Sequence, residues 1–323
     1  MGIKVRASKM GILTTAAVTG LLLAATPGVA VAAPTTDELV KTVTPDEATR
    51  LDIAEPSTPE RRSGGNDASA QNGDGVGLIL SDSTGEYSVP VTVGDATSLN
   101  MESADASSPV GEDSSGSPIY AQQLNDHQQR VITSIDDSDD ASSFRYEFDL
   151  GPNQALDVTD EGIPFVYEED GDEYVIVTVL SAPWAKDAEG RDLATSYSVE
   201  GDTVVQTVDV TDASFPVVAD PTWTVGGARA VVPSTRGGAA DIFLNKKYSQ
   251  DFTTVNNFTC GSVAAVIGLV GTPLAGVGAG VICAAAAAAW SVSLNHNQCA
   301  VLTLRTTVPP VLVPTIYTGG WCK

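Results

Sequence analysis

One stretch of this chain carries no Asp, Glu, Lys or Arg over 53 positions, from Phe252 to Leu304. All four cysteines lie within it or shortly after it, at Cys260, Cys283, Cys299 and Cys322. Crosslinks can supply stability that a small apolar core lacks, so this combination is typical of a disulfide-held module. We therefore predict that residues 239–323 form a disulfide-stapled apolar C-terminal module and not a catalytic domain.

The chain begins like a substrate for export. Three basic residues precede an apolar run over 11–25, and Ala30-Val31-Ala32 then fits the small-residue rule for signal-peptidase cleavage. The apolar run is shorter than the roughly 20 residues that a membrane-spanning helix needs. Residues 1–32 are predicted to be a signal peptide and the protein to be extracellular, with an N-terminal membrane anchor as the alternative.

Four cysteines allow three disulfide connectivities. Cys260 and Cys283 are separated by 23 residues, as are Cys299 and Cys322, and each pair is centred on a turn signal. This symmetry favours pairing within each couple, where each bond would contribute about 3 kcal/mol in the chain-entropy model. A metal site is the alternative, but the chain has no CxxC motif and only two histidines, so neither a metal nor a cofactor is predicted.

Charge divides the chain into two unlike parts. Residues 33–220 hold 39 acidic and eight basic residues, a net charge of −31, whereas residues 221–323 carry a net charge of +4. Binding to nucleic acid releases counterions from clustered cations, so the acidic part is not expected to bind nucleic acid or an anionic membrane. It is expected to confer solubility, with shielding of the C-terminal module as a second hypothesis.

The fold class predicted from these patterns is α+β and multi-domain. A disordered acidic leader is expected over 33–75, because this part is polar and lacks apolar periodicity, apart from a short helical attempt over Asp37–Thr44. A β-rich, meander or sandwich-like module is expected over 76–222, with 94–118 as a loop. A Gly/Pro linker over 223–238 then leads to the C-terminal module.

Strand signals are clearest in the β-rich module. Residues 144–150 alternate strictly, which places Phe144, Tyr146, Phe148 and Leu150 on one face. Glycine-containing turns separate further strand pairs. The expected strands are 76–80, 87–93, 163–167, 174–180, 195–199 and 203–208.

The C-terminal module is expected to be a helical hairpin followed by two strands. Residues 259–270 and 274–294 are rich in Ala, Gly and Val and are separated by Gly271-Thr272-Pro273. The hairpin could be stapled by the first cysteine pair. The runs 300–308 and 311–317 are β-like and flank Pro309-Pro310.

The segment Phe215–Trp223 reads Phe-Pro-Val-Val-Ala-Asp-Pro-Thr-Trp and is similar to a "yPVvaDPtW" ending that commonly leads into a variable C-terminal region. With it, about residues 128–225 resemble a β-rich module of exported actinobacterial proteins, many of them uncharacterised. The segments 144–150, 183–190 and 196–199 also resemble it. Residues 240–323, with Asn245-Lys246-Lys247 and the ending 317–323, resemble the tail of a subset of these proteins. The resemblance implies export and transfers no catalytic residue.

The residues offer little for catalysis. No nucleophile elbow, phosphate loop, HExxH or dinucleotide fingerprint is present. His127 and His296 lie in unrelated contexts, and Cys299 near His296 is expected to be oxidised and to offer no thiolate. A glycosidase pair among the many carboxylates and a weak calcium site over Asp187–Asp192 are alternatives, but both groups of acids are expected to occupy ordinary turns.

Two functional hypotheses follow. The first is a secreted, non-enzymatic binding or cell-envelope-associated module of unknown target. The second is a membrane-active, bacteriocin-like effector whose apolar hairpin is shielded by the acidic front, since Gly276 and Gly280 have the spacing of close-packed membrane helices. The first arm, about 12 residues or 18 Å long, falls short of about 30 Å of hydrocarbon, which favours a buried hairpin. Any contact with the cell envelope or membrane is expected through the C-terminal module.

Overall fold

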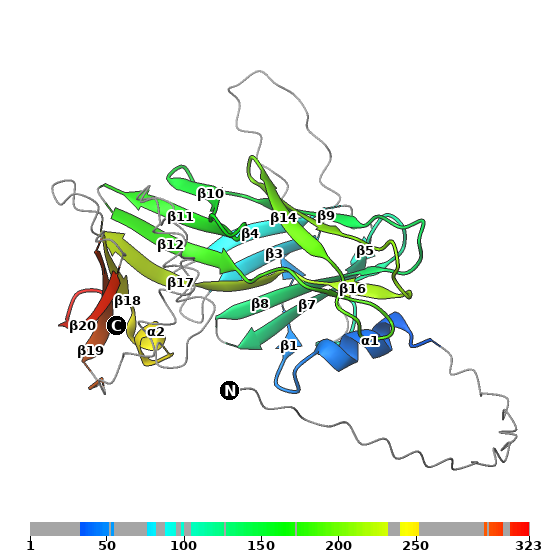
Figure 1. Cartoon of the computed structure of the whole chain (residues 1–323), viewed down its shortest axis with the longest axis horizontal. Coiled ribbons are helices and arrows are strands. Elements are labelled where there is room, and N and C mark those ends of the chain that lie inside the picture. Colours follow the sequence, from blue (N-terminus) through cyan, green and yellow to red (C-terminus); the bar gives the residue numbers. More distant parts are fainter. Residues whose placement is uncertain are drawn as a thin grey trace, which may run out of the picture. The chain divides into compact units, whose positions relative to one another are not determined.

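Two antiparallel sheets contain the described strands (Figure 1). The structure is a computed structural model. It describes residues 33–51, 53–54, 76–81, 88–94, 98–99, 105–125, 127–171, 173–231, 240–251, 294–295, 297–305 and 311–322. The predicted signal peptide, the helix predicted over 259–270, residues 274–293 of the helix predicted over 274–294, and Cys260 and Cys283 lie outside these residues.

The first sheet contains fourteen of the described strands. Its central order is β10-β11-β12-β17-β8-β7-β6-β5, with β1, β13, β16, β18, β19 and β20 joined to this path. Its strands are β1 Thr49–Arg50, β5 Ser98–Leu99, β6 Gly111–Glu112, β7 Pro118–Asn125, β8 Gln128–Ile135, β10 Gln154–Val158, β11 Pro164–Asp170, β12 Glu173–Leu180, β13 Ala185–Lys186, β16 Val217–Ala219, β17 Thr222–Val231, β18 Ala240–Leu244, β19 Gln298–Arg305 and β20 Val311–Thr318.

The second sheet contains six described strands in the order β14-β15-β9-β4-β3-β2. These are β2 Ile53–Ala54, β3 Val76–Ser81, β4 Ser88–Val93, β9 Ser143–Phe148, β14 Thr195–Glu200 and β15 Thr203–Val208. Strand β9 lies between β4 and β15, so strands distant in sequence pair here. The predicted hairpins β11–β12 and β14–β15 are confirmed, with positive φ at Gly171 and Gly201 in their turns.

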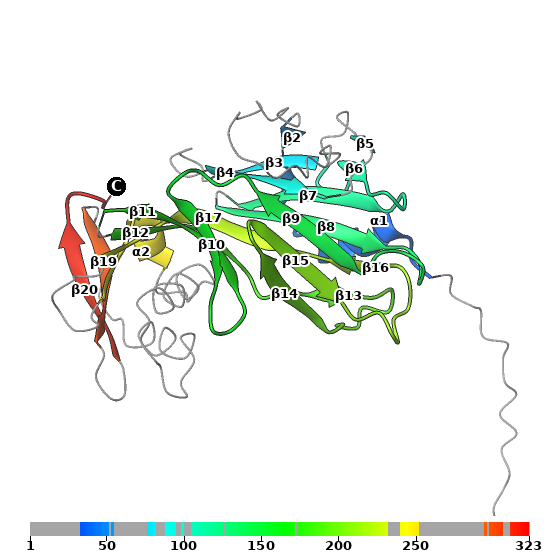
Figure 2. The same cartoon turned by 90° about the horizontal axis from the view of Figure 1, so that it is seen from above.

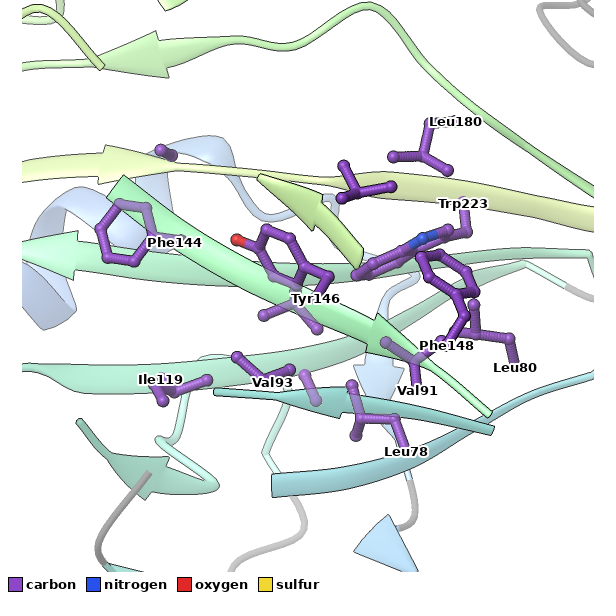
Figure 3. Packing of buried hydrophobic residues seen from close by; sticks show 14 of the residues in the cluster. Leu78, Leu80, Val91, Val93, Ile119, Phe144, Tyr146, Phe148, Leu180 and Trp223 are labelled. Carbon is purple, nitrogen blue, oxygen red and sulfur yellow. The ribbon is translucent and has the colours of Figure 1, made fainter. Parts of the chain in front are cut away.

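The two sheets share one apolar core (Figures 2 and 3). The alternation predicted in β9 is confirmed, because Phe144, Tyr146 and Phe148 are buried and the residues between them are exposed. They pack with side chains of the first sheet, including Ile119 and Trp223. The Tyr146 and Trp223 rings meet edge to face at 5.7 Å between centroids. The predicted β-rich, sandwich-like character is therefore correct.

The opposite face of the first sheet is covered by α1, Thr36–Val43. Thr35 and Glu38 form a capping box that satisfies amide groups at the start of the helix. Leu39 and Val40 are buried against apolar side chains of β7, β8 and β16. The short helix expected over Asp37–Thr44 is confirmed as α1, whereas the expectation that residues 33–75 are disordered is wrong for the described residues 33–51 and 53–54. An amphipathic helix of two turns gains stability from the sheet beneath it, which the local sequence does not reveal.

The predicted linker 223–238 is also corrected. Residues 223–231 belong to β17, the longest described strand, and 232–239 lie outside the described residues. Gly226 and Gly227 stand at a register shift against β12, between the pairs Thr178↔Val225 and Ile176↔Ala228. A glycine pair inside a strand can mark such an irregularity as readily as it marks a turn.

The expected separation into several domains is not observed. The described residues from 33 onward form one compact unit, and β18 continues the first sheet by pairing with β17. The two C-terminal strands predicted around Pro309-Pro310 are confirmed as β19 and β20. A six-residue helix, α2 Lys246–Asp251, follows β18. The loop predicted over 94–118 contains the short strands β5 and β6.

Replacing Leu39 with alanine tests whether α1 is a structural part of the fold. Leu39 is buried on the sheet, so Leu39→Ala is expected to lower the free energy of unfolding by about 3 kcal/mol in urea denaturation. Lys41→Ala, on the exposed side of the same helix, should change it by less than about 0.5 kcal/mol. Equal and negligible effects would show that α1 does not contribute to stability.

Candidate functional site

The segment Phe215–Trp223 contains β16 and the first two residues of β17, two consecutive strands of the first sheet. Strand β16 pairs with residues 133–135 of β8, and β17 pairs with residues 128–130 of the same strand. On the other side, β16 pairs with β13 whereas β17 pairs with β12. Asp220 and Pro221 lie between β16 and β17. At this point the chain exchanges β13 for β12 as one neighbour and keeps β8 as the other.

Asp220 is fully buried at this change of neighbour. Its Oδ1 accepts a hydrogen bond from the Trp184 amide at 3.0 Å, and its Oδ2 accepts one from the Thr222 hydroxyl at 2.8 Å. The Asp220 amide in turn donates to the Trp184 carbonyl at 3.3 Å. The carboxylate thereby joins the chain before β13 to the chain entering β17.

Arg130 of β8 is buried, and its positive charge acts on this carboxylate. Its guanidinium donates to Gln122 Oε1 at 2.6 and 3.0 Å and to the Val43 carbonyl at 2.9 Å, and it lies 5.6 Å from the centre of the Trp184 ring. The Val43 contact also links β8 to the last residue of α1. We call Gln122, Arg130, Trp184, Asp220 and Thr222 the Asp220 junction.

Burial governs the electrostatics of the junction. Burial raises the pKa of Asp220 to about 7, against hydrogen bonds from Trp184 and Thr222 and the positive charge of Arg130, which lower it. Burial also lowers the pKa of Arg130, although the charge of Asp220 opposes that change. These residues make hydrogen bonds to other parts of the protein, and these bonds connect the strands with one another and with α1.

The Asp187–Asp192 turn, the calcium candidate, is arranged differently from a cation site. Asp187 is fully buried, and its two oxygens accept hydrogen bonds from the amides of Glu189, Arg191 and Ser214. The Arg191 guanidinium also binds Asp187 Oδ2 at 2.7 Å. Asp192 instead pairs with Lys186 at 2.6 Å and is 81% exposed. The interpretation as an ordinary turn is therefore favoured.

The Asp187 carboxylate is held in its ionised form. Burial would raise its pKa, but backbone hydrogen bonds from Arg191, Ser214 and Glu189 and the Arg191 side chain outweigh this and lower it. Hydrogen-bond donors therefore surround the two Asp187 oxygens, which a bound cation would need as ligands. In this structure those oxygens bind the turn's own arginine, Arg191.

Several other carboxylates close turns. Each accepts a hydrogen bond from the backbone amide two residues later, the arrangement of an Asx turn. These residues are Asp105, Asp113, Asp137 and Asp209. Among the residues that the structure describes, no group of three or more His, Cys, Asp or Glu side chains could hold a metal ion.

The C-terminal cysteines confirm one of the predicted pairings. Cys299 and Cys322 form a disulfide with their Cα atoms 5.5 Å apart. The chain turns back after β20 through Gly319 and Gly320, both with positive φ, which brings Cys322 to β19. The first pairing predicted, Cys260 with Cys283, lies outside the described residues.

The strands beside this disulfide are joined by specific contacts. Phe243 of β18 and Tyr317 of β20 meet edge to face at 5.1 Å between ring centroids. The Tyr317 hydroxyl donates to the Leu244 carbonyl at 2.8 Å, and the Thr303 hydroxyl donates to Asp241 at 2.6 Å. The disulfide therefore closes a sheet that is already continuous with β17.

The other candidates do not come together as a site. His127 is buried at the start of β8, whereas His296 lies outside the described residues, and Cys299 is oxidised. Arg130, Gln122 and Trp184 were not predicted as a group. The one local sign is Arg130 itself, a charged residue two positions before the apolar Ile132 and therefore on the same face of β8.

Comparison with known proteins identifies no relative. No known protein family, curated protein or solved structure matches this chain. In the described part of the chain, no helix has both the length and the apolar character required to cross a membrane.

The raised pKa of Asp220 predicts how the stability of the protein changes with pH. Because the folded-state pKa of Asp220 is raised to about 7, its stabilising contribution is complete below the unfolded pKa near 4 and is lost as pH rises to about 7. We expect the difference in the free energy of unfolding between Asp220→Asn and the wild type, measured by urea denaturation, to change in favour of the variant between pH 5 and pH 7. The change is expected to reach up to about 1.4 kcal/mol per pH unit.

Asp209→Asn is the matched control. Asp209 is exposed, and hydrogen bonds from the Thr211 side chain and amide lower its pKa. Its contribution is lost only as pH falls below about 4, so its difference from the wild type should stay constant between pH 5 and pH 8. A constant difference for Asp220→Asn as well would contradict the raised pKa.

Proposed function

We propose that this is an exported protein that works outside the cell as a non-enzymatic binding or cell-envelope-associated module. The observation that carries the proposal is the Cys299–Cys322 disulfide in the C-terminal sheet. Disulfides persist in oxidising extracellular compartments and are rare in the cytosol of mesophiles. The basic, apolar and small-residue pattern of residues 1–32 supports export.

We also propose that the chain belongs with the exported actinobacterial proteins that its sequence resembles. The structure supplies a physical reason for the distinctive segment Phe215–Trp223. Its two valines pair as β16, its aspartate bonds to the Trp184 amide, and its tryptophan is buried between the sheets. A segment with these roles tolerates few substitutions, while the chain after β17 is free to differ among proteins that share it.

The proposed absence of catalysis rests on how polar groups are used. Asp187 and Asp220, the two fully buried carboxylates among the described residues, both bind protein donors and serve the fold. A net charge of −24 also disfavours nucleic acid as a partner, because phosphates are bound by clustered cations. The cell envelope and its associated proteins remain the partners proposed, through the C-terminal sheet.

A mass spectrum of the non-reduced protein from the culture medium of the producing cell tests export directly. The expected chain begins at Ala33, and its four cysteines react with an alkylating agent only after reduction. The matched control is the variant with Cys299→Ser and Cys322→Ser, which should take up two alkyl groups after reduction. Recovery of the wild-type chain from the cytosol with residues 1–32 attached and its thiols reactive would refute the proposal.

A membrane-active effector is the second candidate, favoured by the uncharged run from Phe252 to Leu304. In the described end of this run, Ala300, Leu302 and Leu304 are buried in β19, so insertion would require their release. A fragment starting at residue 239 would also lose the pairing of β18 with β17. The whole mature chain is therefore the appropriate sample.

Dye leakage from liposomes separates the two candidates. The oxidised mature chain at micromolar concentration is expected to cause no leakage from zwitterionic or anionic vesicles, because its described apolar strands are already paired and buried. The Cys299→Ser, Cys322→Ser variant is the control for release of the C-terminal sheet. Sustained leakage by the oxidised wild type would favour the effector over the binding module.

A further inference from the structure

One face of the C-terminal strands is apolar and buried. The strand register brings its residues into adjoining rows across the end of β17 and across β18, β19 and β20 (Figure 1). These residues are at most 8% exposed, yet they belong neither to the core between the two sheets nor to the cluster beneath α1. We call them the C-terminal apolar face: Ala228, Ala230, Ala240, Ile242, Leu244, Ala300, Leu302, Leu304 and Leu312.

The other face of the same strands is largely polar. Two buried residues on it, Cys299 and Val301, belong to the disulfide and pair with Phe243, respectively. Its charged and hydroxyl-bearing side chains are half-buried or exposed, namely Arg229, Asp241, Thr303, Arg305 and Thr315. An antiparallel sheet with one polar and one apolar face packs the apolar face against a second layer of the protein.

One segment of the chain is attached at the end of this apolar face. Strand β18 ends at Leu244 and β19 begins at Gln298, and these ends lie together because the two strands are antiparallel neighbours. The helix α2 is fixed there, since Ser249 Oγ donates to the Leu244 carbonyl at 3.1 Å and accepts from the Ala300 amide at 2.8 Å. Residues 252–293, which lie outside the described residues, connect α2 to the chain just before β19. This segment therefore leaves and returns at one end of the face.

The composition of this segment matches the apolar face and not the polar one. Residues 252–293 contain no Asp, Glu, Lys or Arg and are rich in Ala, Gly and Val. On the polar face they would remove Arg229, Asp241 and Arg305 from water without offering a charged partner, which is costly. The C-terminal apolar face carries no polar side chain, so an uncharged layer there has no such cost.

We propose that residues 252–293 dock on the C-terminal apolar face and form the layer that buries it. Docking accounts for the burial of all nine residues, for their separation from the other two cores and for the attachment of the segment at the end of the face. The uncharged run then has its partner within its own chain and not in a membrane. This inference goes beyond the proposed function, because it holds whether or not the protein binds the cell envelope.

Photo-cross-linking of the oxidised mature chain identifies what lies on the face. Ile316 of β20 is half-buried and stands opposite Ala300, so it lies at the rim of the apolar face, whereas its neighbour Thr315 is exposed on the polar face. Ile316→p-benzoylphenylalanine is expected to cross-link to residues 252–293 of the same chain. The control, Thr315→p-benzoylphenylalanine, is expected not to cross-link to this segment. Cross-links from position 316 to a second copy, to lipid when zwitterionic vesicles are present, or to no part of 252–293 would overturn the proposal.

Limited proteolysis provides a second measurement with natural side chains. Leu312 is buried on the apolar face, and Val313, the next residue of β20, is half-buried on the other face. The quantity measured is the rate of chymotrypsin cleavage within 252–293 relative to cleavage elsewhere in the same digest of the mature chain. Leu312→Ala should raise this ratio about tenfold or more, because cleavage of a locally opened segment follows the population of the open form. Val313→Ala should change it by less than about threefold. Equal ratios for the two variants would show that the segment does not rest on this face.

Discussion

Backbone pairing along β17 is the interaction on which the described fold most depends. This strand pairs with β12 on one side, and on the other side with β8 near its start and with β18 near its end. It therefore connects the sandwich to the disulfide-closed C-terminal strands. Trp223, at its second residue, is fully buried in the core, so β17 also fixes how the sheets face each other.

Buried polar groups fix the position of particular strands and of α1 relative to one another. The Asp220 junction holds α1, β8 and the chain before β13 to the start of β17 through directional hydrogen bonds. Asp187 likewise holds its own turn to residue 214, by accepting hydrogen bonds from the amides of Arg191 and Ser214. Apolar packing alone is non-directional, whereas an unpaired buried carboxylate is costly, so these groups specify one arrangement of strands. This role agrees with a protein that offers a stable scaffold for binding.

Sequence reasoning succeeded where a pattern has one structural meaning and failed where distant partners decide. The alternation in β9, the hairpins around Gly171 and Gly201 and the pairing of Cys299 with Cys322 all follow from short-range spacing. The burial of α1 on the first sheet and the inclusion of residues 223–231 in β17 do not. Both depend on surfaces provided by strands far away in the chain, and a glycine pair alone does not distinguish a linker from an irregular strand.

By itself, the sequence determined the strand-rich character of the chain, its uneven charge and the crosslink near its end, because side-chain periodicity, composition and cysteine spacing are local properties. Only the tertiary structure decided which strands are neighbours, and it alone brought Arg130, Trp184 and Asp220 together. Contacts between residues distant in the chain depend on the packing of whole sheets, and no local pattern encodes that packing.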